Sequence, residues 1–136
     1  MIDYANEVFT TVARAVRDNH TGATVMGEYT RKPAKFPTVT VDEISNVMVG
    51  WLEDSSNEEK FAGVTYRIQV FSNNSSRKKS EAREIFATVD AEMRRLGFRR
   101  VTYTTMPEIY KSTIYQITAT YEAVISAAGD VYKRDL

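Results

Sequence analysis

The sequence of 136 residues contains no cysteine, and this absence removes several kinds of chemistry at once. Without thiols there is no disulfide, no thiolate zinc site, no cysteine-held iron–sulfur cluster and no cysteine nucleophile. Histidine is almost as scarce, since His20 is the only one. A metal site built on several histidines is therefore excluded. We interpret His20, which lies among the turn-forming residues 19–22, as a solvated surface residue rather than as a catalytic base.

An excess of charge of either sign is also missing. Lys and Arg together number 18, as do Asp and Glu, so the whole chain has no field that steers it to nucleic acid or an anionic membrane. No apolar run approaches the length that crosses a bilayer. Residues 1–16 lack the basic start and apolar core of a secretion signal. We therefore expect a soluble protein that is made and kept inside a cell.

No arrangement of residues predicts catalysis. Gly22 and Gly27 are spaced like the glycines of a phosphate-binding loop, but Glu28 stands where that loop requires lysine. An active site made of carboxylates alone would be consistent with the inventory, but no feature selects one. The sequence thus predicts a protein that is not an enzyme and that binds no cofactor or metal. Three pairs of adjacent carboxylates, interpreted as solvated charges or as residues on opposite strand faces, are Asp42-Glu43, Glu53-Asp54 and Glu58-Glu59.

Two segments have apolar residues at the three- and four-residue spacing of an amphipathic helix. The first covers residues 2–18 and ends in the turn at residues 19–22. The second follows residues 73–76, which are turn and N-cap formers, and runs to about Leu96. Gly97 is placed to close the second helix as its C′ residue.

Five segments have strand character, namely residues 23–29, 37–46, 63–72, 98–105 and 113–126. The order α-β-β-β-α-β-β predicts an α+β fold, with a mainly antiparallel sheet of about five strands and two helices packed on one face. We expect a single domain over residues 1–136, with a long hairpin or loop at about 46–62 and a short charged C-terminal tail. Alternation is strongest in two strands, whose expected inner faces are Val64, Tyr66, Ile68 and Val70 in one and Tyr115, Ile117, Ala119, Tyr121, Ala123 and Ile125 in the other.

Helix electrostatics explain one group of basic residues but not two others. Arginines at 94–100 lie at the end of the second helix, where they complement the helix dipole, and Asp90 is placed to pair with Arg94. Residues 77–79, by contrast, are basic at the start of that helix, where positive charge is unfavourable. Residues 31–35 form a second basic group on a turn that contains proline. Each of these two groups is either simply solvated or meets a partner.

The segment 53–59 is acidic and lies beside Trp51, the only tryptophan, which either caps the core or anchors an interface. We hypothesise that this acidic segment meets a basic group of a neighbouring subunit. The candidate assembly interface comprises Arg31, Lys32, Lys35, Trp51, Glu53, Asp54, Glu58, Glu59, Arg77, Lys78 and Lys79.

An ordered set of short motifs resembles a known family. The motifs are Ile2-Asp3-x-x-Asn6-Glu7-Val8-Phe9, Gly27-Glu28-Tyr29, Phe36-Pro37-x-Val39, Tyr66-x-Ile68-x-Val70-Phe71-Ser72-Asn73, Lys78-Lys79-Ser80-Glu81-Ala82, Met93-x-x-Leu96-Gly97-Phe98 and Ile114-Tyr115-x-Ile117-Thr118-x-x-Tyr121. Together they resemble the tail terminator, or tail-completion, proteins of long-tailed bacteriophages, which are often labelled minor capsid proteins.

The resemblance implies a sheet packed by two helices and a homohexameric ring on the head-proximal end of the tail tube, at the head–tail junction of the virion. Its implied partners are other copies of the chain, the tail tube protein and a head-completion or connector protein. DNA would pass through the lumen with loose contact, and no membrane is involved. The resemblance implies assembly in the cytoplasm of a host bacterium and supplies no catalytic residues.

Two other functions fit the same sequence. A head-closure or neck connector protein of the same junction would share the size and the lack of reactive groups. A small nucleic-acid-binding module could use the two basic groups, although the balanced charge argues against it.

Overall fold

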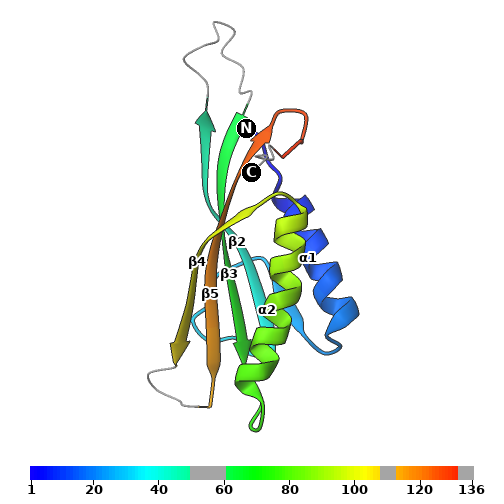
Figure 1. The fold of residues 1–136 in the computed structure, drawn as a ribbon, viewed down its shortest axis with the longest axis vertical. Coiled ribbons are helices and arrows are strands. Elements are labelled where there is room, and N and C mark those ends of the chain that lie inside the picture. The colour runs from blue at the N-terminus through cyan, green and yellow to red at the C-terminus, as the bar shows by residue number, and fades with distance from the viewer. Residues whose placement is uncertain (50–60, 108–112, 132–136) are drawn as a thin grey trace, which may run out of the picture.

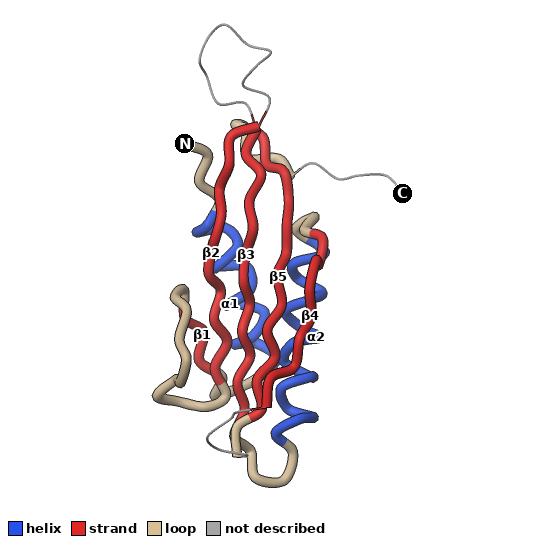
Figure 2. Tube along the Cα trace, turned by 90° about the vertical axis from the view of Figure 1, so that its left-hand side faces the viewer, coloured by secondary structure: helices blue, strands red, loops and turns tan. Residues whose placement is uncertain are grey.

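A computed structural model describes residues 1–49, 61–107 and 113–131. A five-stranded sheet has the strand order β1-β2-β3-β5-β4, in which β1 and β2 are parallel and every other pair is antiparallel. Both helices lie on one side of this sheet (Figure 1), and its other face is open in the perpendicular view (Figure 2). The predicted α+β fold and element order are confirmed. The elements are α1 (Ala5–Asn19), β1 (Thr24–Met26), β2 (Thr38–Val49), β3 (Phe61–Ser72), α2 (Lys78–Arg95), β4 (Arg99–Pro107) and β5 (Tyr115–Ser126).

Several predicted boundaries differ from the observed ones. Helix α1 begins at Ala5, whose backbone N–H donates to the Asp3 carboxylate at 3.0 Å, rather than at Ile2. Strand β1 has only three residues, because the chain leaves the sheet after Met26. Strand β2 continues to Val49 and β3 begins at Phe61, so the connection predicted at 46–62 is shorter at both ends. The predicted tail falls mainly at 132–136, outside the described residues.

The ends of α2 follow from specific backbone interactions. The Asn74 side-chain oxygen accepts hydrogen bonds from the backbone N–H groups of Ser76 and Arg77, both at 3.2 Å, just before the helix begins. At the other end Gly97 has φ 97°, the left-handed conformation that glycine adopts readily. Its N–H bonds to the Arg94 carbonyl, and the next N–H bonds to the Met93 carbonyl. This pair of bonds is a Schellman motif, which confirms Gly97 as the C′ residue.

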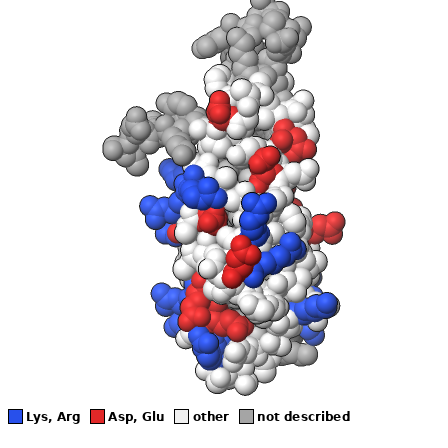
Figure 3. Space-filling model, turned by 90° about the vertical axis from the view of Figure 1, so that its right-hand side faces the viewer, with Lys and Arg blue, Asp and Glu red and all other residues white. Residues whose placement is uncertain are grey.

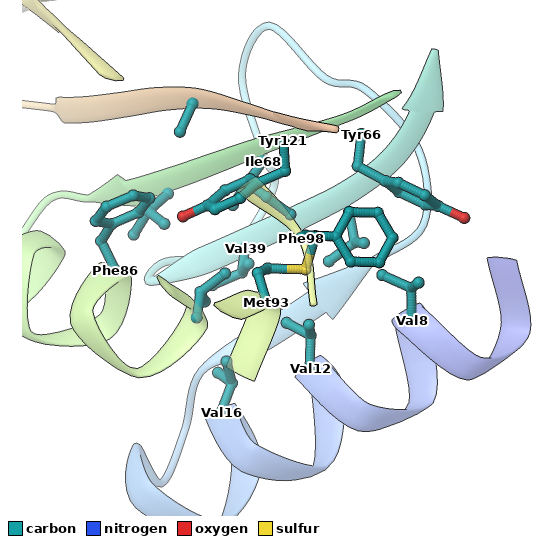
Figure 4. Packing of buried hydrophobic residues seen from close by; sticks show 14 of the residues in the cluster. Val8, Val12, Val16, Val39, Tyr66, Ile68, Phe86, Met93, Phe98 and Tyr121 are labelled. Carbon is teal, nitrogen blue, oxygen red and sulfur yellow. The ribbon is translucent and has the colours of Figure 1, made fainter. Parts of the chain in front are cut away.

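The core lies between the helices and the inner face of the sheet. The valines of α1 point from one helical stripe toward the strands (Figure 4), and Val8, Val12 and Val16 are completely buried. From the sheet, the alternate residues of β3 and β5 meet them, and the ring of Phe98 packs edge-on against Tyr66 with centroids 5.3 Å apart. The predicted inner faces of both strands are thus confirmed, except that Tyr115 and Ala123 are half-buried.

Two core tyrosines, Tyr66 and Tyr121, point their hydroxyls in opposite directions out of the core (Figure 4). The Tyr66 hydroxyl donates to Glu43 at 2.9 Å, and the Tyr121 hydroxyl donates to Asp90 at 2.6 Å. Burial, reinforced by these carboxylates, raises the pKa of both phenols far above its usual value. Asp90 also accepts from Arg100 at 3.1 Å, so its partner is Arg100 and not the predicted Arg94.

Candidate assembly surfaces

The middle of the open sheet face is polar but carries little net charge, whereas its Val49 end also presents the exposed Val47 and Phe61. Asp42 on β2 and Arg67 on β3 form an ion pair at 2.9 Å, and Arg99 and Glu122 are opposite each other on β4 and β5. Each of these two pairs joins one positive and one negative side chain, so neither pair has a net charge. Strand register and side-chain alternation place the following short polar side chains on this face: Ser45, Thr65, Thr102, Thr104, Gln116, Thr118 and Thr120.

The connection 27–37 covers one end of the open face. The Gln69 side chain is almost completely buried and holds this connection, because it exchanges hydrogen bonds with the backbone of Thr30 and accepts one from Thr40. Further along, the ring of Tyr29 lies 4.3 Å from the Arg67 guanidinium carbon, a cation–π contact. The Arg67 Nε is buried without a hydrogen-bond partner. On β2 and β3 the open face is therefore free of covering chain only toward the Val49 end.

The basic candidates lie at one end of the long strands. Thr38, the first residue of β2, donates to the backbone carbonyl of Lys35 at 2.6 Å, which places Lys35 at that end. Arg77 follows the last residue of β3, which pairs at the same end, and forms an ion pair with Glu84 at 2.8 Å. The exposed candidates of the two groups are Arg31, Lys32, Lys35, Arg77 and Lys79, with Lys78 half-buried.

The acidic candidates and the tryptophan lie outside the described residues: Trp51, Glu53, Asp54, Glu58 and Glu59. The residues that flank them, Val49 and Phe61, pair with each other at the opposite end of the β2–β3 ladder from Thr38. The ladder has 12 residues in each strand, so its ends are roughly 36 Å apart at about 3.3 Å per residue. The structure therefore does not bring the flanks of the acidic segment near the basic candidates of the same chain.

The helix side differs in character from the open face. Basic and acidic side chains are interspersed across it (Figure 3), as on an ordinary solvated surface. His20, predicted to be solvated, is half-buried at the end of α1, and its Nε2 lies 2.8 Å from the Thr88 hydroxyl of α2. Among the described residues no group of three or more His, Asp or Glu side chains could hold a metal ion. No helix in the described ranges has the length and apolarity to span a membrane.

An open cavity of about 1060 Å³ lies where β4 begins, between the Gly63 region of β3 and Phe98. Its lining includes three arginines and one carboxylate, Glu122. One of the arginines, Arg100, is already bonded to Asp90. This lining contains neither a nucleophile paired with a base nor two neighbouring carboxylates, so it offers no acid–base chemistry.

Exposed apolar residues lie on β2 and β4, at opposite sides of the sheet, and the sequence pattern did not predict these two surfaces. On β4, Val101, Tyr103 and Met106 are 42–47% exposed, and on β2, Val47 is 57% exposed. Strand β4 was predicted as a strand, but its position at the edge of the sheet follows from the order β3-β5-β4, in which β5 enters between two strands that precede it in the chain. The order of the strands along the chain does not predict that β5 lies between β3 and β4.

Comparison with known proteins finds similarity among solved structures. No protein-family model and no curated protein matches the chain. The chain is similar to a chain in the solved structure of the virion of a native gene transfer agent particle, with a TM-score of 0.57 and 13% identity. The match covers 90% of this chain and 91% of that chain. The two chains thus share a fold over nearly their whole lengths.

Proposed function

We propose that the protein is a structural component of a phage-type particle, and specifically a tail terminator that caps the head-proximal end of the tail tube. In this role copies of the chain form a ring, which we propose is a hexamer, that ends tube polymerisation and joins the tail to the head. The observation that carries this proposal is the shared fold with a chain of a gene transfer agent virion. The motif resemblance adds the position within the particle.

The described surfaces support assembly rather than catalysis. Reactive side chains that a mechanism could use are either scarce or already bonded, as with Glu43 and Asp90, which accept from buried tyrosines. Polar sheet surface and exposed apolar strand residues, by contrast, are plentiful. Contiguous exposed apolar residues on a small protein commonly mark contact surfaces. We therefore assign the protein no enzymatic activity.

The positions of the charged candidates fit contacts along the axis of such a ring, with the tail tube protein on one side and the head-completion protein on the other. The residues that flank the acidic segment, Val49 and Phe61, lie at one end of the β2–β3 ladder. The basic candidates begin about 36 Å away along the ladder. We propose that one charged end of the subunit meets the tail tube protein and the other meets the head-completion protein. A contact between the acidic segment and a basic group of a neighbouring subunit is the alternative hypothesis, which the charge reversal below distinguishes.

The open sheet face suits a lumen through which DNA passes. Tight binding to DNA requires Lys and Arg side chains that neutralise phosphates. On this face the Arg67 charge is balanced by Asp42, and Arg99 lies opposite Glu122. Hydroxyl and amide groups lie between these charged pairs, and Val47, Phe61 and Met106 add exposed apolar area near the ends of the strands. Such a surface would let DNA slide without holding it.

Electron microscopy of particles assembled with and without the protein tests the proposal. Loss of a tail terminator should give tails of unregulated length that do not join heads. Tails of normal length that fail to join heads would instead indicate a head-closure or neck connector protein. Normal infectious particles would contradict both roles, and salt-dependent retention on DNA at physiological ionic strength would favour a nucleic-acid-binding module.

A charge reversal tests the axial contacts. The double variant Lys78→Glu, Lys79→Glu should still form rings but should fail to dock onto the tail tube or the head. Arg83→Glu, an exposed change further along α2, serves as the matched control. If the double variant loses ring formation on a sizing column while the control keeps it, the basic residues contact ring neighbours, and the axial assignment is wrong.

A further inference from the structure

The sheet ends in two backbone edges that no described strand covers. Strand β4 pairs with β5 on one side only, over nine residues, Arg99–Pro107. At the opposite side of the sheet β1 pairs with β2 only at Thr38–Thr40, which leaves residues 41–49 of β2 without a described neighbour there. The two edges without a described strand partner are thus nine residues long each, and at its Val41 end the β2 edge lies near the connection 27–37, since Tyr29 contacts Arg67, the partner of Asp42. Backbone groups along such edges are templates for pairing with another strand.

Both edges are also apolar in a way that solvent-facing edge strands usually avoid. On β4, Val101 is 44% and Met106 is 47% exposed. On the free part of β2, Ile44 is 45% and Met48 is 43% exposed. Each edge contains one bulge, and the bulge residue is itself one of these apolar residues, Ile44 or Val101. Neither edge carries a lysine, the residue that most often blunts exposed edges.

The charges on the two edges have opposite sign. The charged residues of β4 are Arg99 and Arg100, whereas those of β2 residues 41–49 are Asp42 and Glu43. Within the chain, however, Arg100 already pairs with Asp90, Asp42 pairs with Arg67, and Glu43 accepts from Tyr66. These charges therefore do not select the contact. The features that fit one edge to the other are their exposed apolar residues and their opposite strand directions.

From these observations we infer that β4 of one subunit pairs with residues 41–49 of β2 in a second copy of this chain. This inference names the contact that builds the ring and so rests on the proposed function. Because the contact joins two different edges at opposite sides of one sheet, it is heterologous and can propagate until a ring closes. Strands β2 and β4 run in opposite directions within the sheet. A neighbour that continues the sheet in the same orientation therefore pairs antiparallel.

Strand β1 sets the offset between neighbours. In register, Met106 of β4 lies in the same row as Thr38 of β2, through Gln116 and Phe71. Since β1 already occupies the edge at Thr38–Thr40, β4 of the neighbour must lie at least three residues toward the Val49 end. This offset is about 10 Å at 3.3 Å per residue. A regular stagger between strands is what closing a sheet into a barrel requires.

Cysteine cross-linking tests the contact, because the natural chain has no cysteine to confuse the result. We would mix Val101→Cys with a mass-tagged Val47→Cys protein, add a short bismaleimide, and measure the mixed dimer. A second pair, Tyr103→Cys with Ile44→Cys, repeats the test at another level of the edge. Ala87→Cys with Ala91→Cys, both on the exposed face of α2, is the control. Circular dichroism verifies that each variant is folded.

The inference requires at least tenfold more mixed dimer from either edge pair than from the control pair. Val101→Cys cross-linked chiefly to itself would indicate a symmetric β4–β4 dimer and would overturn the inference. Yields equal to the control, whether the protein is monomeric or oligomeric at the concentration used, would also overturn it. The test needs only the purified protein. A tail terminator whose ring uses other surfaces would give no edge cross-link but would still control tail length in the microscopy test. A protein from elsewhere in the particle could give the edge cross-link without controlling tail length.

Discussion

The stability of the protein should fall steeply above pH 10 because of the two tyrosines whose hydroxyls bond to carboxylates. Tyr66 is 1% exposed and Tyr121 is not exposed at all. Burial and the adjacent Glu43 and Asp90 carboxylates both raise the pKa of these phenols in the folded state. In the unfolded chain the same phenols have a pKa of about 10.

The sign and the size follow from proton linkage. Below pH 10 the phenols are protonated in both states, so their contribution to stability does not change with pH. Above pH 10 the unfolded chain releases the two protons and the folded protein keeps them, which favours unfolding. Each tyrosine lowers the free energy of unfolding by about 1.4 kcal/mol per pH unit, and both together by about 2.7 kcal/mol per unit.

Urea unfolding between pH 9 and pH 11 measures this slope, with Tyr121→Phe as the diagnostic variant. At pH 9 the variant should lose about 1.5–3 kcal/mol, the usual value of a hydrogen bond to a charged group. Above pH 10 its slope should be shallower than that of the wild type by about 1.4 kcal/mol per unit. Tyr29→Phe, which removes the hydroxyl of a residue that is 48% exposed, is the control. A Tyr121→Phe slope equal to that of the wild type would refute the reasoning.

Three smaller perturbations test the packing. Met93→Ala, at a fully buried position, should lower the free energy of unfolding by about 2–5 kcal/mol in urea. Gln69→Ala should release the connection 27–37 and speed its cleavage by trypsin roughly tenfold or more, since it removes buried hydrogen bonds worth about 1–3 kcal/mol. Thr88→Val removes the partner of His20 and should cost about 1 kcal/mol in urea, and an unchanged midpoint would mean that this contact contributes nothing.

Side-chain periodicity predicted the parts of the fold that local pattern controls. The alternation in β3 places Val64 and Ile68 on the buried face because a strand between two neighbours has one face toward the helices. The closing turn of α2 was predictable for a similar reason, since Gly97 serves the C-cap through its own backbone freedom. These features depend on residues that are close in sequence.

Features that depend on distant residues were not predictable. The chain leaves β1 after Met26 because the Gln69 side chain holds the backbone of Thr30. The sequence of residues 23–29 does not predict this hydrogen bond. Asp90 bonds to Arg100 rather than Arg94 because pairing of β4 with β5 brings Arg100 beside the helix. His20 likewise finds Thr88 through helix packing.

The candidate surfaces were predicted only in part, since charge is visible in a sequence and edge position is not. The sequence singled out the basic residues near Lys35 and Arg77, and whether they meet a partner remains a prediction. The apolar edge of β4 carries no local mark, because Val101 and Tyr103 would be equally typical of a strand in the middle of a sheet.

At one end of the sheet both faces are covered, whereas at the other end only one face is covered. Strand β3 runs between these ends and therefore has two different local stabilities. Near Phe71 the backbone of β3 lies between the helices and the connection 27–37, whereas near Phe61 its outer face meets solvent. Opening the hydrogen bonds near Phe71 therefore exposes more apolar surface and costs more free energy than opening those near Phe61. Amide protons along this one strand should exchange in a graded order, and the end that opens most easily is the end that carries the free edge of β2.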